Sequence, residues 1–175
     1  MKSGLIFTLF LIGVFAGASL AQDPSVIAAK KAQMNKLDKL AGQWKGSGWI
    51  QQGPNRENFT GTETVQKKLD GLALLVEGSF SNTEGKGIHQ TLAVLSSNDK
   101  MNGYVFATYL ASGITGIQDF QAFSDHFEWG FAIPNVGTVR YTIKVDDKTW
   151  SEIGEFSRDG RTWGKNFEMK LDRVK

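Results

Sequence analysis

The sequence contains no cysteine. This absence excludes a disulfide framework, a thiolate metal site and a cysteine nucleophile. Many small domains rely on disulfides for stability, so this chain has to be held together by its hydrophobic core. Residues 22–175 suffice for one domain, which can bury about two-thirds of the surface of its unfolded chain.

Neither sign of charge dominates the sequence, which has 20 lysines and arginines, 18 aspartates and glutamates, and a formal net charge of +2. This balance favours neither nucleic acid nor an anionic membrane as a partner, and we expect neither. Histidine is scarce, with 2 residues. Since a transition-metal site needs two or three converging ligands, we expect no metal site.

The chain has one long hydrophobic run, between residues 4 and 17. It is shorter than the roughly 18 residues that a membrane-spanning helix needs. Lys2 precedes the run and the small-residue site Ser19-Leu20-Ala21 follows it, which is the arrangement of a secretory signal peptide. We therefore predict a signal peptide over residues 1–21, no membrane span in the mature chain, and export to the periplasm or the extracellular space.

A helix is predicted over residues 22–42. Asp23 followed by Pro24 is a typical helix start, with an acidic N-cap before proline at the first helical position. An apolar stripe follows at helical spacing and consists of Ile27, Met34, Leu37 and Ala41.

Residues 43–175 alternate between apolar and polar side chains, as in Phe127-Glu128-Trp129 and Phe167-Glu168-Met169. Period two with one apolar face is typical of half-buried antiparallel strands. Turn signals recur regularly, so the pattern predicts about ten short sequential strands. We predict an all-β fold, an antiparallel up-and-down barrel with one N-terminal helix, because closure removes exposed edges. The alternative is a two-sheet sandwich, whose long crossovers are hard to find among uniformly short loops.

The stretch from Leu40 to Trp49 reads LAGQWKGSGW and places Gly-x-Trp at the start of the first strand, directly after the helix. Together with the arginine on the final strand, Arg173, it resembles the calycin superfamily of lipocalins, fatty-acid-binding proteins and nitrobindin-like barrels. The resemblance implies that Arg173 packs over Trp44 as a structural pair. A cation over a tryptophan face stabilises by about 0.5–2 kcal/mol.

A narrower resemblance is to secreted bacterial proteins of a domain-of-unknown-function family. Three short motifs carry it: Leu40–Gly48, Lys68–Leu72, and Phe156–Trp163 with Phe167–Arg173. The family resemblance is evidence for fold, and fold does not define activity.

A barrel of this size can hold one small ligand among its inward side chains. The inward apolar residues are predicted to be Phe59, Val65, Leu74, Val76, Leu92, Val94, Phe120, Phe127, Trp129, Phe131, Tyr141, Ile143, Phe167 and Met169. Polar residues of the same phase either pair with one another or orient a ligand. The predicted ligand-binding residues are Glu63, Gln90, Gln118, Phe120, Trp129, Phe131 and Tyr141.

Nitrobindin-like barrels resemble this sequence and bind haem through a histidine near the C-terminus. The sequence departs from that pattern, because its histidines are His89 and His126, neither of them in the last two predicted strands. We expect His89 to face solvent and His126 to lie in a turn. No cofactor is therefore expected, haem included.

The sequence thus favours an exported, monomeric or weakly dimeric barrel that binds a small apolar or amphipathic molecule. Two alternatives remain. One is an enzyme of isomerase or cyclase type, in which Glu63 and Tyr141 supply acid–base chemistry. The other is a filled barrel with a structural or interaction role, which would contain no cavity larger than a water molecule.

Overall fold

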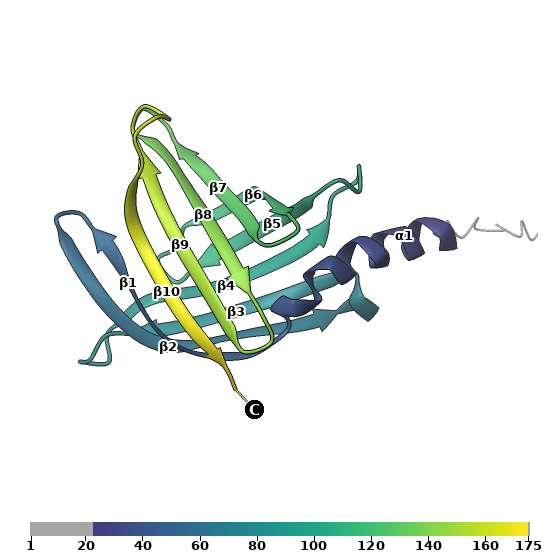
Figure 1. Ribbon diagram of the computed structural model, residues 1–175, viewed down its shortest axis with the longest axis horizontal. Helices are drawn as coiled ribbons and strands as arrows, with labels where there is room; N and C mark the ends of the chain where they lie inside the picture. Colours follow the sequence, from purple (N-terminus) through teal and green to yellow (C-terminus); the bar gives the residue numbers. More distant parts are fainter. Residues whose placement is uncertain (1–22, 175) are drawn as a thin grey trace, which may run out of the picture.

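The computed structural model describes residues 23–174, which form an N-terminal helical segment, a ten-stranded sheet and a short 3₁₀-helix, η2 (Leu69–Gly71) (Figure 1). The signal peptide predicted for residues 1–21 lies outside the described residues. The strands are β1 (Gly42–Gln52), β2 (Asn55–Lys68), β3 (Ala73–Ser81), β4 (Gly87–Ser97), β5 (Tyr104–Leu110), β6 (Thr115–Ala122), β7 (Phe127–Ile133), β8 (Gly137–Val145), β9 (Thr149–Ser157) and β10 (Gly164–Arg173).

The helical segment begins at Asp23, whose carboxylate accepts a hydrogen bond from the Ser25 amide at 2.8 Å. The α-helix, α1, spans Pro24–Met34 and continues as a 3₁₀-helix, η1, over Asn35–Leu40. Three residues per turn suit this sequence, since Met34, Leu37 and Leu40 recur every third residue and are all buried. The predicted helix over 22–42 is therefore an α-helix in its first part only.

The ten strands form a closed barrel in which each strand pairs antiparallel with its sequence neighbours, and β1 closes the ring against β10. The predicted all-β barrel with one N-terminal helix is confirmed, and the sandwich alternative is wrong. Short hairpins connect the strands, so strands that follow each other along the chain are also neighbours in the sheet. The ring is weakest between β6 and β7, which pair over three residues only, from Phe120↔Trp129 to Ala122↔Phe127.

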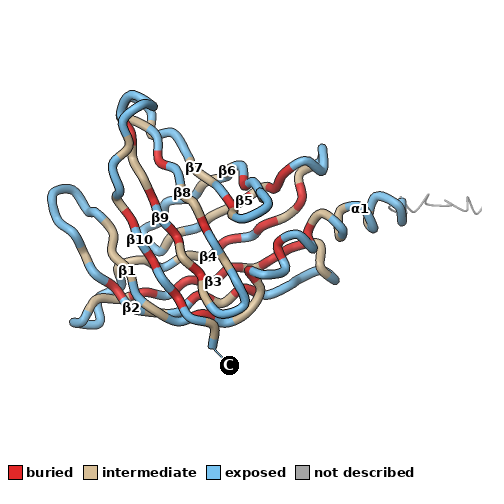
Figure 2. Tube along the Cα trace, viewed as in Figure 1, coloured by how far each residue is buried: buried red, intermediate tan, exposed pale blue. Residues whose placement is uncertain are grey.

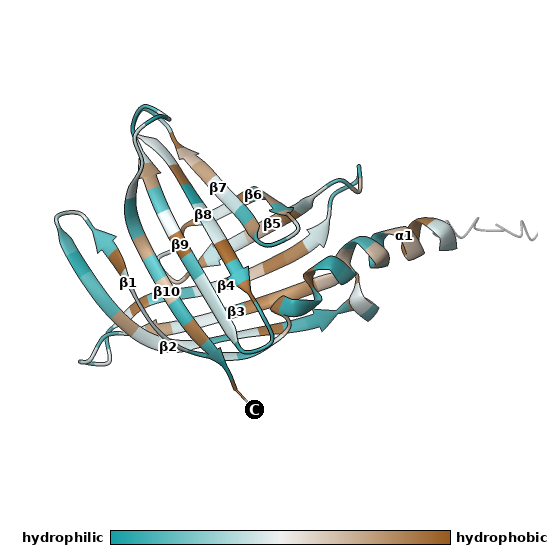
Figure 3. Ribbon diagram, viewed as in Figure 1, coloured by the Kyte–Doolittle hydropathy of each residue, from teal (hydrophilic) through white to brown (hydrophobic). Residues whose placement is uncertain are grey.

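The core lies inside the barrel. Along β10, hydrophobic and hydrophilic residues alternate (Figure 3), and the same alternation separates buried from exposed positions (Figure 2). Phe167, Met169 and Leu171 are buried, whereas Glu168 and Lys170 face outward. Such alternation is what a sheet with one covered face requires.

In strand β4 the residues that point inward differ from those predicted from the sequence. Leu92 and Val94, predicted to point inward, are 43% and 36% exposed, while Ala93 and Leu95 are buried. A bulge opposite Phe80 shifts the register where β4 begins, and residues 92–95 are apolar on both faces, so period two alone does not define the inward phase. A slip of one residue turns every side chain to the other face.

The end of the barrel next to the helix is closed by Trp44 and Arg173, which face each other across the β1–β10 pair. The Arg173 guanidinium lies 4.0 Å from the Trp44 ring centroid. It also donates hydrogen bonds to the carbonyls of Lys39 at 2.8 Å and Ala41 at 2.7 Å. The Trp44 indole donates to the Leu40 carbonyl at 2.9 Å, so the end of the helical segment is hydrogen-bonded to the first strand here.

Candidate functional site

A cavity of about 500 Å³ occupies the barrel interior. Leu40 at the end of η1 forms part of its lining near the closed end, and Ile114, Ile117 and Phe131 line its other side. These three side chains are 64%, 79% and 37% exposed, so they mark the mouth of the cavity. The volume lies within the range of about 300–1,000 Å³ that is usual for ligand pockets, which contradicts the filled-barrel alternative.

Six of the seven residues predicted to bind a ligand line this cavity: Glu63, Gln118, Phe120, Trp129, Phe131 and Tyr141. The seventh, Gln90, does not. It is exposed on the outer face of β4, because the inward positions of that strand are occupied by His89 and Thr91. The prediction that Gln90 binds a ligand in the cavity is therefore wrong. Like Leu92 and Val94, Gln90 was assigned to the inner face of β4 but lies on the outer one.

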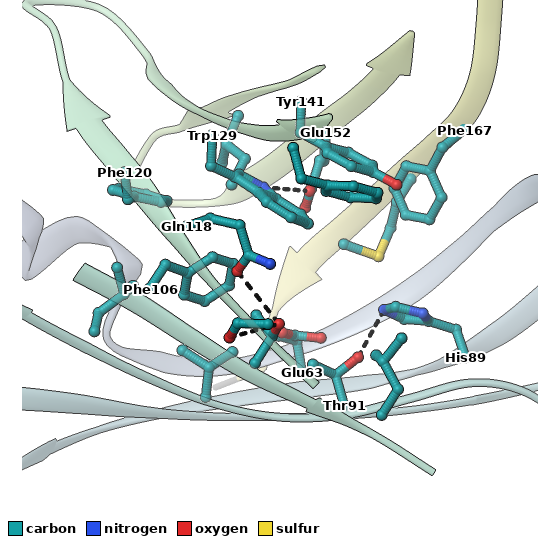
Figure 4. Close-up of a pocket in the computed structure, with 18 of the residues that line it drawn as sticks. Glu63, His89, Thr91, Phe106, Gln118, Phe120, Trp129, Tyr141, Glu152 and Phe167 are labelled. Carbon is teal, nitrogen blue, oxygen red and sulfur yellow. Dashed lines mark hydrogen bonds between the residues drawn. The ribbon is translucent and has the colours of Figure 1, made fainter. Parts of the chain in front are cut away.

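Aromatic rings form a continuous part of the cavity wall (Figure 4). Trp129 on β7 and Tyr141 on β8 face each other in register and stack with centroids 4.2 Å apart and planes at 8°. Phe106 meets Trp129 edge-on at 5.0 Å, and Phe167 meets Tyr141 edge-on at 5.6 Å. Pairs of this kind stabilise beyond their buried area, so the wall is a packed surface against which a ligand can lie.

Glu63 is one of the acidic residues that line the cavity. Its side chain points into the cavity from β2 and is 7% exposed. It has no hydrogen-bond partner among residues 23–174. Burial, together with a smaller contribution from the negative charge of Glu152, raises the pKa of its carboxyl to about 8. At neutral pH the empty site therefore holds Glu63 mainly in its protonated form.

Glu152 on β9 is a second buried carboxyl, which the sequence analysis missed. Its two oxygens accept hydrogen bonds from the indoles of Trp129 at 3.3 Å and Trp150 at 3.4 Å. Burial raises the pKa of Glu152 to about 7 against the lowering effect of these two donors. The signal that could have identified it is its phase, two residues after the inward Trp150.

His89 also lines the cavity, and the expectation that it faces solvent is wrong. Its Nε2 lies 2.9 Å from Thr91 Oγ1, and its ring packs against those of Phe80 and Phe167. Burial lowers the pKa of the imidazole, so it is neutral at physiological pH. The expectation of no haem therefore cannot rest on a solvent-facing His89. It now rests on the lack of histidine in the last two strands.

Other polar groups in the lining are Gln118 and Thr108, which are hydrogen-bonded to each other: the threonine hydroxyl lies 3.3 Å from Gln118 Oε1. The Tyr141 hydroxyl has a raised pKa because of burial and the nearby Glu152 charge, so it is a hydrogen-bond donor rather than a phenolate. His126 lies before β7, at the surface, beside Asp125 and Glu128. The cavity therefore offers neutral donors and acceptors together with two acids.

A closed antiparallel barrel with an internal cavity open at one end defines a lipocalin-like fold. Solved structures of other proteins share it, and two of them follow. The chain is similar to Rv2717c from M. tuberculosis, with a TM-score of 0.64 and 16% identity over 82% of this chain and 98% of that one. It is also similar to the S-type phycobiliprotein lyase CPES from Guillardia theta, with a TM-score of 0.53 and 12% identity over 83% and 97% of the two chains.

At these identities the likeness concerns the fold alone. No family model and no curated protein matches the chain. The resemblance to a domain-of-unknown-function family thus stays a prediction. Between residues 23 and 174, no helix has the length and apolar character needed to cross a membrane.

Proposed function

We propose that this protein binds a small, mainly apolar molecule inside its barrel. The observation that carries the proposal is the cavity of about 500 Å³, walled by aromatic rings and containing an unpartnered, buried carboxyl at Glu63. Sites for small molecules combine mainly apolar walls with a few placed polar groups. The Glu63 carboxyl faces this space and can share a hydrogen bond with a polar group of the ligand.

The test is binding of an uncharged apolar dye, N-phenyl-1-naphthylamine, followed by fluorescence. The half-buried Thr108 faces the cavity, so Thr108→Phe fills part of the space and should weaken dye binding at least about tenfold. Leu92 on the outer face of the adjacent strand is a matched control, and Leu92→Phe should leave dye binding unchanged. Absence of dye binding, or equal binding by both variants, would contradict a ligand site in the barrel.

We also propose that the protein is exported and works in the periplasm or outside the cell, on the basis of the signal-peptide pattern over residues 1–21. The intact mass of protein recovered from the source organism tests this. A mature chain that begins at Gln22 supports export, and a full-length chain that is retained in the cytoplasm contradicts it.

A second candidate function is acid–base catalysis, which the raised pKa of Glu63 favours. A carboxyl whose pKa lies near the working pH can both donate and accept a proton. Glu63 would act on an apolar substrate in the cavity, with the Tyr141 hydroxyl as a donor. Loss of turnover in both Glu63→Gln and Tyr141→Phe, with dye binding retained, distinguishes an enzyme from a carrier; the assay needs a substrate found by screening.

A further inference from the structure

Among residues 23–174, the side chains that line the cavity can contribute negative charge but no lysine or arginine charge. Glu63 and Glu152 contribute carboxyl groups, whereas none of the lining residues in the described part of the chain is a lysine or an arginine. His89 is neutral there, since burial lowers its pKa. A ligand with a carboxylate or phosphate would therefore find no basic partner and would meet two acids. This composition discriminates against anionic lipids and fatty acids.

The two carboxyls come from separate parts of the wall, because β1 and β10 lie between β2 and β9 around the barrel. Both side chains are buried and point into the same cavity (Figure 4). They are close enough for the charge of Glu152 to raise the pKa of Glu63. A positive group in the cavity would remove this repulsion and would stabilise both groups in the ionised form.

The two carboxyls differ in how they are held. Glu152 is oriented by the indoles of Trp129 and Trp150 and keeps lone pairs for a further donor. Glu63 has no partner among residues 23–174 and lies over Gly78, where the missing side chain leaves it room. The site thus has one carboxyl in a defined position and one that lacks a donor.

The aromatic wall adds to the attraction for a cation. Trp129 and Tyr141 stack beside Glu152, with Phe106 and Phe167 at their edges. Aromatic rings attract ammonium groups through their quadrupole, most strongly where water is excluded. An apolar ligand body and a cationic head would both be accommodated within one cavity.

We propose that the cavity binds an apolar molecule bearing a protonated amine, with the ammonium group between Glu63 and Glu152 and the apolar body against the aromatic wall. The inference rests on the proposed ligand-binding function and names the ligand class. Glu63, Glu152, Tyr141 and His89 are the titratable groups facing the cavity. Because an amine of pKa about 10 stays protonated while the carboxyls ionise, binding releases protons and tightens as pH rises.

The experiment is isothermal titration calorimetry with three probes that share one apolar body: 2-(1-naphthyl)ethylamine, 2-(1-naphthyl)ethanol and the anion of 1-naphthaleneacetic acid. At pH 8 the amine should bind at least about tenfold more tightly than the alcohol, and the acetate should not bind measurably. Between pH 6 and pH 8 the affinity for the amine should rise by about tenfold per pH unit for each proton released. Titrations in phosphate and in Tris, which differ in ionisation enthalpy, count these protons on the unmodified protein.

Variants assign the effect to the two carboxyls. Glu63→Gln and Glu152→Gln keep the side-chain shape and should each reduce the amine-to-alcohol affinity ratio to within about threefold of unity. Glu77, on the outer face of the neighbouring strand β3, is the matched control, and Glu77→Gln should keep the full ratio. If a variant fails to fold, the number of protons that the unmodified protein releases on binding the amine still tests the proposal.

Equal binding of amine and alcohol, tighter binding of the acetate, or no proton release would overturn the amine proposal while leaving a ligand-binding barrel in place. If none of the three naphthyl probes binds but N-phenyl-1-naphthylamine does, the amine proposal is likewise overturned and the ligand-binding barrel remains. Failure of the uncharged dye as well would overturn the proposed function itself.

Discussion

The carboxyl group of Glu63 occupies the space that a side chain at Gly78 would take. The two residues face each other across β2 and β3, and a Cβ atom at Gly78 would lie 2.6 Å from Glu63 Oε2. The next nearest atoms are at 3.4 Å, so the conflict is with Glu63 alone. The glycine therefore allows a buried acid to lie against the wall of the barrel.

Gly78→Ala should lower the free energy of unfolding by about 1 kcal/mol, because the added methyl group pushes aside the flexible end of the buried Glu63 side chain. Urea unfolding measures the change. Gly164→Ala is the control, since a Cβ there meets nothing within 4 Å. In a Glu63→Ala background the effect of Gly78→Ala should largely vanish, and an additive double mutant would show that the conflict lies elsewhere.

The seam between Trp44 and Arg173 should depend on the guanidinium rather than on positive charge alone. Arg173→Lys keeps the charge but loses the planar group that bonds to the carbonyls of Lys39, Ala41 and Asp147 while it covers the indole. We expect a loss of about 1–3 kcal/mol in the free energy of unfolding. The control is Arg158→Lys at an exposed turn, and an equal effect at both positions would disprove a specific role for the seam.

Stability should fall as the pH rises toward 8. In the folded protein the pKa values of Glu63 and Glu152 are raised to about 8 and about 7 from an ordinary 4.5. Each carboxyl then holds its proton more tightly when folded, so its contribution is complete below pH 4.5 and is lost as pH rises through the folded value. The Glu63→Gln variant has no carboxyl to ionise at this position, so it should lose less stability as the pH rises.

Relative to the unmodified protein, Glu63→Gln should thus gain about 2–4 kcal/mol between pH 4 and pH 8. Chemical denaturation at a series of pH values gives the comparison, with the exposed Glu77→Gln as the reference. A difference between Glu63→Gln and the unmodified protein that does not change with pH would mean that Glu63 is ionised in the folded state.

The indole of Trp129 should tune the acidity of Glu152. Trp129→Phe keeps an aromatic ring for stacking on Tyr141 but removes the donor to Glu152 Oε1. The pKa of Glu152 should then rise above about 7, because a hydrogen bond to the ionised form is lost. Carbon-13 NMR of the glutamate carboxyls follows the titration; Trp163→Phe, at a ring covered by Arg140, should leave it unchanged.

Much of the barrel could be predicted from the order of residues. The alternation in β7, β8 and β10 was clear because one face of each strand is apolar and the other polar. Glu63, Gln118 and the aromatic residues were placed inward by the same rule, and they line the cavity. Strand β4 failed because apolar side chains lie on both of its faces, so Gln90 was chosen where His89 and Thr91 point inward.

The sequence by itself determined the strand period, the helix start at Asp23 and the chain of short hairpins, because these depend on neighbours along the chain. Only the tertiary structure decided that Glu63 and Glu152 share a cavity whose lining, among residues 23–174, includes no lysine or arginine. Closure of β1 on β10 brings β2 near β9, and burial there raises the pKa of both carboxyls. Their environment comes from strands distant in sequence, which no local pattern can specify.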